Sequence, residues 1–198
     1  MLSHLKEKYH LDNVSAKYIS SKRSAIRLYR NKVVEIIFSE ENIDSLDDFL
    51  PFVDTLKEIT LYKCNLSDLN ELKRFERLKD LKLEYCSFPN MDIFNNFPDF
   101  PDLKTLEITK NKKINNLNIS SNSIKTLNIS DTSITNLANV NIPKLKELRT
   151  TNNYIKFIDK SFPCLPISAA ACVIRTYSPI CPTYKMPPSS FSPVWNGL

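Results

Sequence analysis

A repeated apolar pattern constrains this chain more than any other feature. Counted from its first residue, the pattern has apolar residues at positions 1, 4 and 6 and a polar residue or cysteine at position 9. The clearest copies are LKEITLYKCNL, LKDLKLEYCSF, LKTLEITKNKK, IKTLNISDTSI and LKELRTTNNYI, which begin at Leu56, Leu78, Leu103, Ile124 and Leu145, and a degenerate copy, VVEIIFSEENI, begins at Val33. The steps between these starts are 23, 22, 25, 21 and 21 residues. Such nearly constant spacing predicts one structural unit per copy, each stacked on the next.

A shorter echo of ten residues, seen in INNLNIS and IKTLNIS, lies inside this pattern. Ten residues cannot run along one strand and also return to begin a neighbouring strand about 4.8 Å away. We therefore interpret the echo as half of one turn, with Leu117 and Ile119 pointing into the core from the return side. The alternative makes each ten-residue copy a strand of its own.

The full pattern resembles the leucine-rich-repeat superfamily over about residues 33–158, with about six repeats of 21–25 residues. The resemblance implies an α/β fold, a solenoid with a parallel β-sheet on its concave face and irregular or short helical segments on its convex side. After Leu66, apolar residues recur every three positions as far as Leu78, which favours a 3₁₀ return in that unit. Later units are rich in Asn and Ser and favour an irregular return.

Three regions follow from this assignment. Residues 1–32 are expected to form a basic N-terminal cap and residues 33–160 the repeat solenoid. Residues 161–198 hold seven of the twelve prolines, three of the five cysteines and no acidic residue. This Pro/Cys-rich tail has no repeat pattern, and we expect it to be partly or largely disordered.

The composition argues against an enzyme. Gly197 is the single glycine, so the glycine-rich loops that cradle phosphates have no counterpart. No catalytic constellation and no metal-ligand spacing is apparent, and we expect no cofactor and no metal. Cys64 and Cys86 occupy the ninth position of their repeats, as Asn111, Thr132 and Asn153 do, where a polar side chain would satisfy backbone groups at a turn. No signal peptide and no apolar stretch of membrane-spanning length is seen, so an intracellular location, cytoplasmic or nuclear, is expected.

The resemblance also implies where function would reside. In this superfamily the exposed face of the sheet binds other proteins, so we expect a non-catalytic interaction module, monomeric by itself, that binds a protein or peptide on its concave face. A regulatory subunit or a scaffold would be one form of it. Tyr62 and Tyr85 are the expected anchors, about 5 Å apart on adjacent strands. The full candidate set is Tyr62, Lys63, Lys82, Glu84, Tyr85, Glu107, Lys110, Asn128, Arg149 and Asn152.

Lysine occupies the second position of five successive repeats. These residues are Lys57, Lys79, Lys104, Lys125 and Lys146. They could form a basic rail for an acidic partner, or they could simply keep the edge of the sheet soluble. Acidic residues at the third position, such as Glu58 and Asp80, would neutralise part of the row, and the sequence favours the second interpretation.

A basic segment at residues 13–34 gives an alternative function. It contains six positive residues and no acidic one: Lys17, Lys22, Arg23, Arg27, Arg30 and Lys32. A contact between this basic segment and an anionic partner would make the protein a nucleic-acid-associated factor. The competing interpretation is structural, because AIRLYR and VVEIIF could form an edge hairpin that shields the first repeat.

Overall fold

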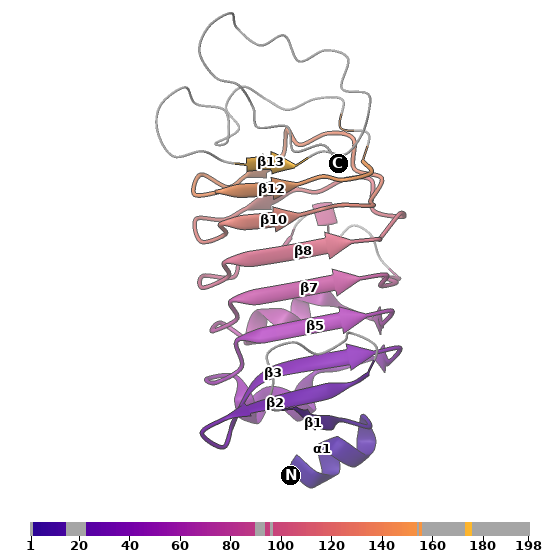
Figure 1. Cartoon of the computed structure of the whole chain (residues 1–198), viewed down its shortest axis with the longest axis vertical. Helices are drawn as coiled ribbons and strands as arrows, with labels where there is room; N and C mark the ends of the chain where they lie inside the picture. The colour runs from indigo at the N-terminus through magenta and orange to yellow at the C-terminus, as the bar shows by residue number, and fades with distance from the viewer. Residues whose placement is uncertain are drawn as a thin grey trace, which may run out of the picture.

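One long β-sheet runs through the molecule from end to end. The computed structural model describes residues 2–14, 23–89, 94–95, 97–153, 155 and 173–175. The sheet has nine strands in the order β1-β2-β3-β5-β7-β8-β10-β12-β13, and every neighbouring pair is parallel except β2 and β3 (Figure 1). The strands are β1 (Asp12–Val14), β2 (Ala25–Tyr29), β3 (Lys32–Ser39), β5 (Glu58–Tyr62), β7 (Asp80–Glu84), β8 (Thr105–Thr109), β10 (Thr126–Asn128), β12 (Glu147–Arg149) and β13 (Val173–Arg175).

The predicted repeat starts place the strands correctly. Strands β5, β7, β8, β10 and β12 each begin two residues after the apolar residue that opens their repeat. The register is constant, so that Ile59 pairs with Leu81, and the fourth-position residues continue through Leu106 and Leu127 to Leu148. These side chains are buried, while the residues between them face outward. The alternation is that of a parallel sheet with one face on the core.

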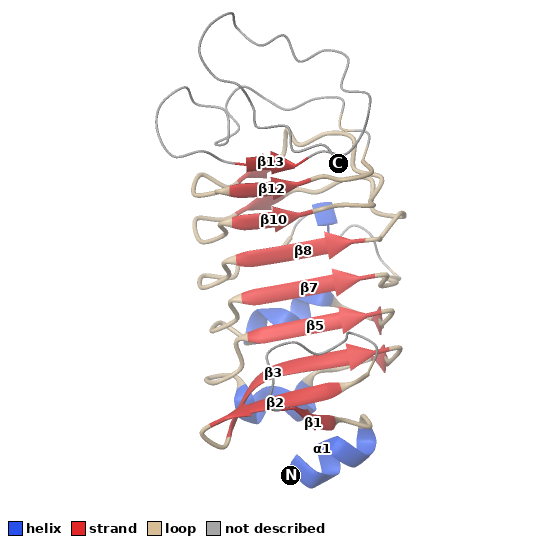
Figure 2. Ribbon diagram, viewed as in Figure 1, coloured by secondary structure: helices blue, strands red, loops and turns tan. Residues whose placement is uncertain are grey.

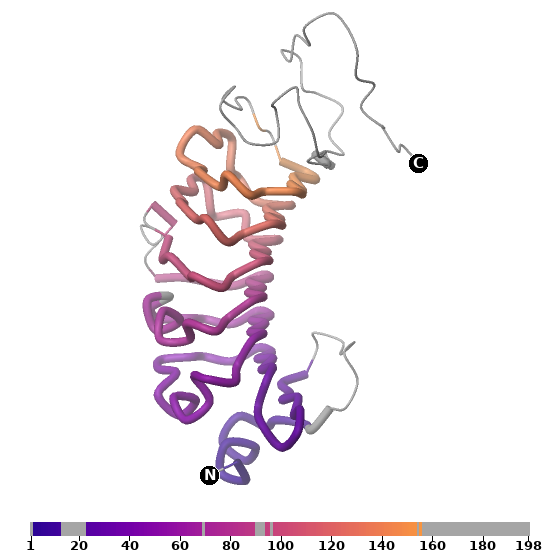
Figure 3. Tube along the Cα trace, turned by 90° about the vertical axis from the view of Figure 1, so that its left-hand side faces the viewer, coloured from indigo at the N-terminus to yellow at the C-terminus, as the bar shows by residue number. Residues whose placement is uncertain are grey.

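The return segments run on the other side of the core (Figure 3). The first two repeats return through the 3₁₀ helices η1 (Asp47–Phe52) and η2 (Leu69–Arg74) (Figure 2). The spacing of three predicts η2, whereas the repeat pattern does not predict η1. Short parallel pairs also form there: β4 (Asn42–Ile43) with β6 (Asn65–Leu66), and β9 (Ile119–Ser120) with β11 (Val140–Asn141). Within the described residues the one α-helix is α1 (Leu2–Lys8), so helices contribute little to this α/β fold.

The half-turn interpretation of the ten-residue echo is confirmed. Leu117 is fully buried, and Ile119 lies in β9 on the return side with its side chain in the core. Asn118 between them is exposed. Four phenylalanines of the longest repeat, which the repeat pattern does not include, fill the core next to this segment. They are Phe88, Phe94, Phe97 and Phe100, and their consecutive ring centroids lie 5.0, 6.4 and 5.9 Å apart.

Each repeat turns off the sheet at a left-handed residue. The eighth position has φ between 52° and 62° in all six repeats, at Glu40, Lys63, Tyr85, Lys110, Asp131 and Asn152. This region favours glycine, but the chain uses larger residues there. The backbone N–H groups of the first five donate to carbonyls of the next repeat at 2.8–3.2 Å, which ties each corner to the one that follows.

The hairpin expected near the N-terminus is present. Strands β2 and β3 are antiparallel and are joined at Arg30 and Asn31, which both have positive φ. Strand β1 lies outside the hairpin, and α1 lies at the same end of the molecule (Figure 1). At the other end, β13 pairs in parallel with β12. Most of the tail at 161–198 lies outside the described residues, as do residues 15–22.

Candidate functional site

The ten candidate residues lie in three neighbouring rows on and beside the exposed face of the sheet. The fifth position of the repeat contributes Lys82, Glu107, Asn128 and Arg149, which follow one another in register across β7, β8, β10 and β12. The seventh position contributes Tyr62 and Glu84, which are paired residues of β5 and β7. The left-handed eighth position contributes Lys63, Tyr85, Lys110 and Asn152. The structure therefore brings the predicted residues together across five successive repeats.

The two tyrosines meet, although not as direct strand neighbours. Glu84 stands opposite Tyr62, so Tyr85 lies one residue further along, at the corner. The left-handed backbone of Tyr85 nevertheless brings its ring to Tyr62 with the ring centroids 6.0 Å apart and the planes at 90°. Tyr85 is 48% exposed and Tyr62 is half-buried. The pair presents an edge-to-face aromatic surface at the carboxyl ends of β5 and β7.

Two lysines frame the tyrosine pair. Lys63 Nζ lies 5.3 Å from the centroid of the Tyr62 ring, and Lys110 Nζ lies 5.0 Å from that of the Tyr85 ring. Lys110 also donates to Glu84 at 2.8 Å. We call Tyr62, Lys63, Glu84, Tyr85 and Lys110 the tyrosine cluster. Its cation–π and hydrogen-bond contacts link three successive repeats and hold the rings in place.

The charges around the tyrosine cluster are paired. Lys63 Nζ lies 2.7 Å from Glu40 Oε1, and this hydrogen bond raises the pKa of Lys63. The hydrogen bond to Glu84 likewise raises the pKa of Lys110. In the fifth-position row, Lys82 Nζ lies 3.5 Å from Glu107 Oε1. A partner docking here would meet a nearly neutral, aromatic surface.

The fifth-position row ends at a paired arginine. The Nε of Arg149 donates to Glu147 Oε1 at 2.9 Å, and this hydrogen bond is the largest cause of the raised pKa of Arg149. Both side chains lie on β12, two residues apart on the same face. Arg149 is half-buried, so its guanidinium is positioned by its own strand.

The basic segment at 13–34 is less available than its composition suggests. Arg27 donates to Glu35 at 2.6 Å and to Glu58 at 2.8 Å, and its side chain is 17% exposed. Arg23 Nη1 lies 3.8 Å from Asp12 Oδ2. Arg30 and Lys32 are exposed beside the hairpin turn, whereas Lys17 and Lys22 lie outside the described residues.

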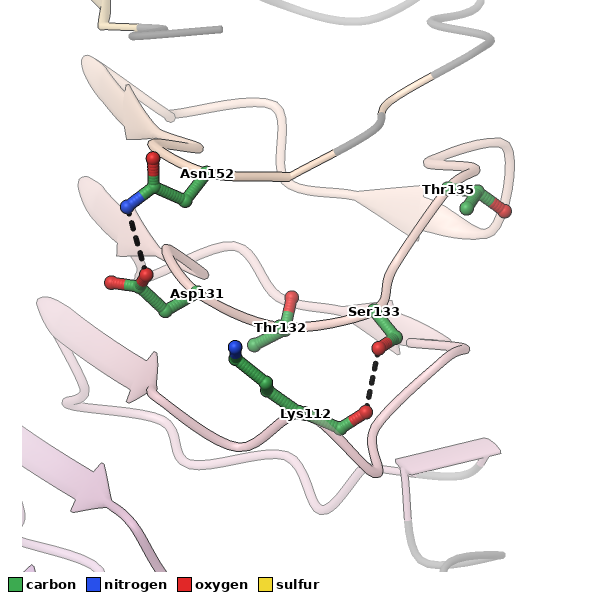
Figure 4. Close-up of a pocket in the computed structure, with 6 residues that line it drawn as sticks. All are labelled: Lys112, Asp131, Thr132, Ser133, Thr135 and Asn152. Carbon is green, nitrogen blue, oxygen red and sulfur yellow. Dashed lines mark hydrogen bonds between the residues drawn. The ribbon is translucent and has the colours of Figure 1, made fainter.

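A polar pocket of ≈430 Å³ is lined by residues of the fourth, fifth and sixth predicted repeats: Lys112, Asp131, Thr132, Ser133, Thr135 and Asn152 (Figure 4). Asn152 donates to Asp131 Oδ1 at 2.9 Å, and the Ser133 hydroxyl donates to the carbonyl of Lys112 at 2.6 Å. The Thr132 hydroxyl is buried and donates to the carbonyl of Ile129. The lining groups are thus largely committed to the structure, and of the sequence candidates only Asn152 reaches this pocket.

The ninth-position residues have the structural role expected of them. Asn111 donates to the carbonyls of Leu83 and Thr109 at 2.8 and 2.9 Å. The Cys64 thiol lies 3.4 Å from the carbonyl of Tyr62, and the Cys86 thiol lies 3.3 Å from that of Leu61. Burial raises the pKa of Cys86 to about 12, which leaves a thiol that is protonated at neutral pH and a poor nucleophile.

The described part of the chain contains neither a metal site nor a membrane-spanning helix. There, no three residues among His, Cys, Asp and Glu are grouped as metal ligands. No helix in that part is long and apolar enough to cross a membrane.

Two features of the site could not be found by reading the repeats. The ion pairs of the tyrosine cluster join side chains 23 to 26 residues apart, and the repeat alignment gives only their columns. The left-handed corner also carries no residue signature, since its six members include Glu, Lys, Tyr, Asp and Asn.

Comparison with known protein families gives a match over most of the chain. Residues 27–171 match the family model described as the LRR repeats of FBD-associated F-box protein At5g56370. The matched range covers all strands from β3 to β12 and most of β2. No curated protein and no solved structure matches the chain.

Proposed function

This chain belongs to the leucine-rich-repeat family defined by the FBD-associated F-box protein repeats, and from that premise we propose that it is a protein-interaction module. Its repeats form a solenoid, the exposed sheet is the concave face, and a protein or peptide binds there. Residues 33–160 are the binding unit, and residues 1–32 cap its first repeat. The module is non-catalytic and acts as a scaffold or regulatory subunit.

The tyrosine cluster is the observation that carries this proposal. Tyrosine offers a rigid, amphipathic surface that loses little side-chain entropy on binding and is enriched at hot spots. The ring centroids of Tyr85 and Tyr62 lie 6.0 Å apart, and the rings make cation–π contacts with Lys110 and Lys63. A preorganised pair lowers the ordering cost of association. The paired charges around it would form the polar rim of such an interface.

The alternative function, nucleic-acid association through residues 13–34, receives less support. Phosphate binding requires cations that are free to pair with phosphate. Arg27 is already engaged by Glu35 and Glu58. A function based on this segment would depend mainly on Arg30, Lys32 and residues outside the described part of the chain.

Affinity capture from the native cell extract, followed by binding measurements with the captured protein, tests the proposal. We expect Tyr85→Ala and Tyr62→Ala each to weaken binding by about 1 to 3 kcal/mol, which is the usual range for an aromatic hot spot. Stability should change little for Tyr85, because its ring is 48% exposed.

Tyr29→Ala is the matched control. Tyr29 is 58% exposed and has Arg30 5.3 Å from its ring, so it resembles Tyr85 in exposure and in its cationic neighbour. It lies at the end of β2, away from the tyrosine cluster. If Tyr29→Ala weakens binding as much as Tyr85→Ala, or if Lys22→Ala/Arg23→Ala/Arg27→Ala abolishes binding while the Tyr62 and Tyr85 variants bind normally, the sheet face is not the binding surface.

A further inference from the structure

A second surface of distinct chemistry follows the opposite edge of the sheet. One lysine stands immediately before each of β5, β7, β8, β10 and β12, at the edge where the strand arrows begin in Figure 1. The backbone N–H of each lysine donates to the backbone carbonyl of the second-position residue in the preceding repeat, at 2.7–2.9 Å. These hydrogen bonds connect the backbones of the five lysines from one repeat to the next. We call Lys57, Lys79, Lys104, Lys125 and Lys146 the lysine row.

The lysines of the row form no salt bridges with the neighbouring acids in the described part of the chain. Glu58 and Glu147, which follow Lys57 and Lys146, instead pair with Arg27 and Arg149. Of the acids that the sequence sets against the row, these two are therefore engaged elsewhere, while Asp80 stays next to Lys79.

The spacing of the row makes its charges interact. Adjacent parallel strands lie about 4.8 Å apart, well inside the Debye length of about 8 Å at physiological ionic strength. Like charges held at this spacing repel one another, although flexible stems let the ammonium groups spread. Four of the five lysines are exposed and Lys104 is half-buried. An anionic chain lying along the row would relieve this repulsion while gaining its own ion pairs.

We propose that the lysine row binds an extended acidic segment of a protein partner, lying across the starts of the strands. Four steps of about 4.8 Å give a row about 19 Å long, which matches about six residues of extended chain at about 3.3 Å each. This inference rests on the proposed function only for the class of partner, a protein, because the row lies at the other end of the strands from the tyrosine cluster.

The side chains of the row favour an acidic peptide over a nucleic acid. The lysine ammonium is a compact point charge that can pair with any nearby carboxylate. Single-stranded nucleic acids are usually held by aromatic side chains that stack on bases, together with a basic groove. The five lysines of the row have no aromatic residue and no arginine among them, and Tyr85 lies at the opposite ends of the strands. Tyr29 and Arg30 do lie at the same edge as the row, at the turn between β2 and β3, so a nucleic-acid probe belongs in the test.

Fluorescence anisotropy with the full chain and labelled hexaglutamate tests the row directly. Hexaglutamine serves as the uncharged probe and hexauridylate as the nucleic-acid probe. We expect hexaglutamate to bind at low salt, and Lys79→Glu/Lys125→Glu to weaken it by at least about tenfold through like-charge repulsion. Lys73→Glu/Lys113→Glu, which changes net charge equally at exposed lysines outside the row, should weaken it by less than about threefold.

Several outcomes would overturn the inference. Equal losses in the two double variants would reduce the effect to net charge, and absence of hexaglutamate binding at low salt would remove the site. Tighter, row-dependent binding of hexauridylate would assign the row to nucleic acid. Lys79→Gln/Lys125→Gln guards against misfolding, since it removes charge without adding repulsion and should still weaken hexaglutamate binding.

The same assay separates this inference from the proposed function. Tyr85→Ala should leave hexaglutamate binding unchanged, because Tyr85 is remote from the row. Retention of hexaglutamate binding together with normal capture by the tyrosine variants would overturn the sheet-face proposal alone. Loss of capture in the tyrosine variants without any hexaglutamate binding would overturn the row alone.

Discussion

Asn111 illustrates how single residues close the turns of this fold. Its side chain is 4% exposed and spans two repeats, because Nδ2 donates both to Thr109 of its own strand and to Leu83 of the preceding one. Asn153 does the same work two repeats later, with Nδ2 on the carbonyl of Ile129 and Oδ1 on the N–H of Thr132. Buried backbone groups at a corner have no water to bond, so these amides stabilise the stack.

Asn111→Ala should therefore destabilise the protein by about 1 to 3 kcal/mol, the cost of leaving buried carbonyls without this donor. Asn116→Ala is the control, because Asn116 is exposed and its Nδ2 bonds only to the exposed Asn95. Its effect should stay within about 0.5 kcal/mol, as for most surface substitutions. Urea unfolding measures both, and equal losses would show that the corner amide has no special role.

At the scale of the element, the return segment from Ile114 to Ile119 is the decisive case. Leu117 is fully buried and Asn118 is exposed, although the two are adjacent. The Asn118 N–H donates to the carbonyl of Phe94, and the Ile119 N–H donates to that of Asn139. The segment is therefore held by backbone hydrogen bonds to both neighbouring repeats, and its side chains decide only which face is apolar.

Leu117→Ala should cost about 2 to 4 kcal/mol, as removal of a buried leucine side chain usually does. Asn118→Ala should cost little, because the Asn118 side chain is exposed and its backbone bonds are kept. Urea unfolding of the two single variants gives the comparison. Similar losses at both positions would contradict the half-turn assignment of the ten-residue echo.

The elements also show how far the sequence could lead. The repeat period predicted β5, β7, β8, β10 and β12, their register and the buried fourth position, because a period encodes identical neighbours. It did not predict the packing of Phe94 against Phe88 and Phe97, because the 25-residue repeat interrupts the spacing. It also could not show that Glu58 pairs with Arg27 and not with the adjacent Lys57, since this contact depends on the hairpin of β2 and β3.

At the scale of the whole molecule, stability and both proposed binding surfaces depend on neighbouring repeats. In the long sheet, each strand from β3 to β12 is hydrogen-bonded to the strands beside it, so the sheet is a chain of nearest-neighbour contacts. The tyrosine cluster and the lysine row are products of this stacking, since each takes its members from successive repeats. A strand at either end has one unprotected edge unless another segment pairs with it.

At the C-terminal end, β13 is the segment that pairs with β12. Val173–Arg175 align with Glu147–Arg149 in parallel register, within a tail whose sequence shows no repeat pattern. The core beneath β12 is provided by Leu145 and Leu148, which precede the tail. We therefore expect a chain cut after Pro166 to keep its repeats folded but to leave the edge of β12 open.

Comparison of that chain with one cut after Ile180, which keeps β13, tests the role of this strand. Far-UV circular dichroism should show folded repeats in both. The shorter chain should self-associate more strongly in sedimentation velocity, because an open edge offers unpaired N–H and C=O groups to a second copy. In the shorter chain, Glu147→Lys replaces the carboxylate that pairs with Arg149 by a second positive charge on the edge strand, and this should suppress association. If the two chains are equally monomeric and unfold at the same urea concentration, β13 does not protect the sheet.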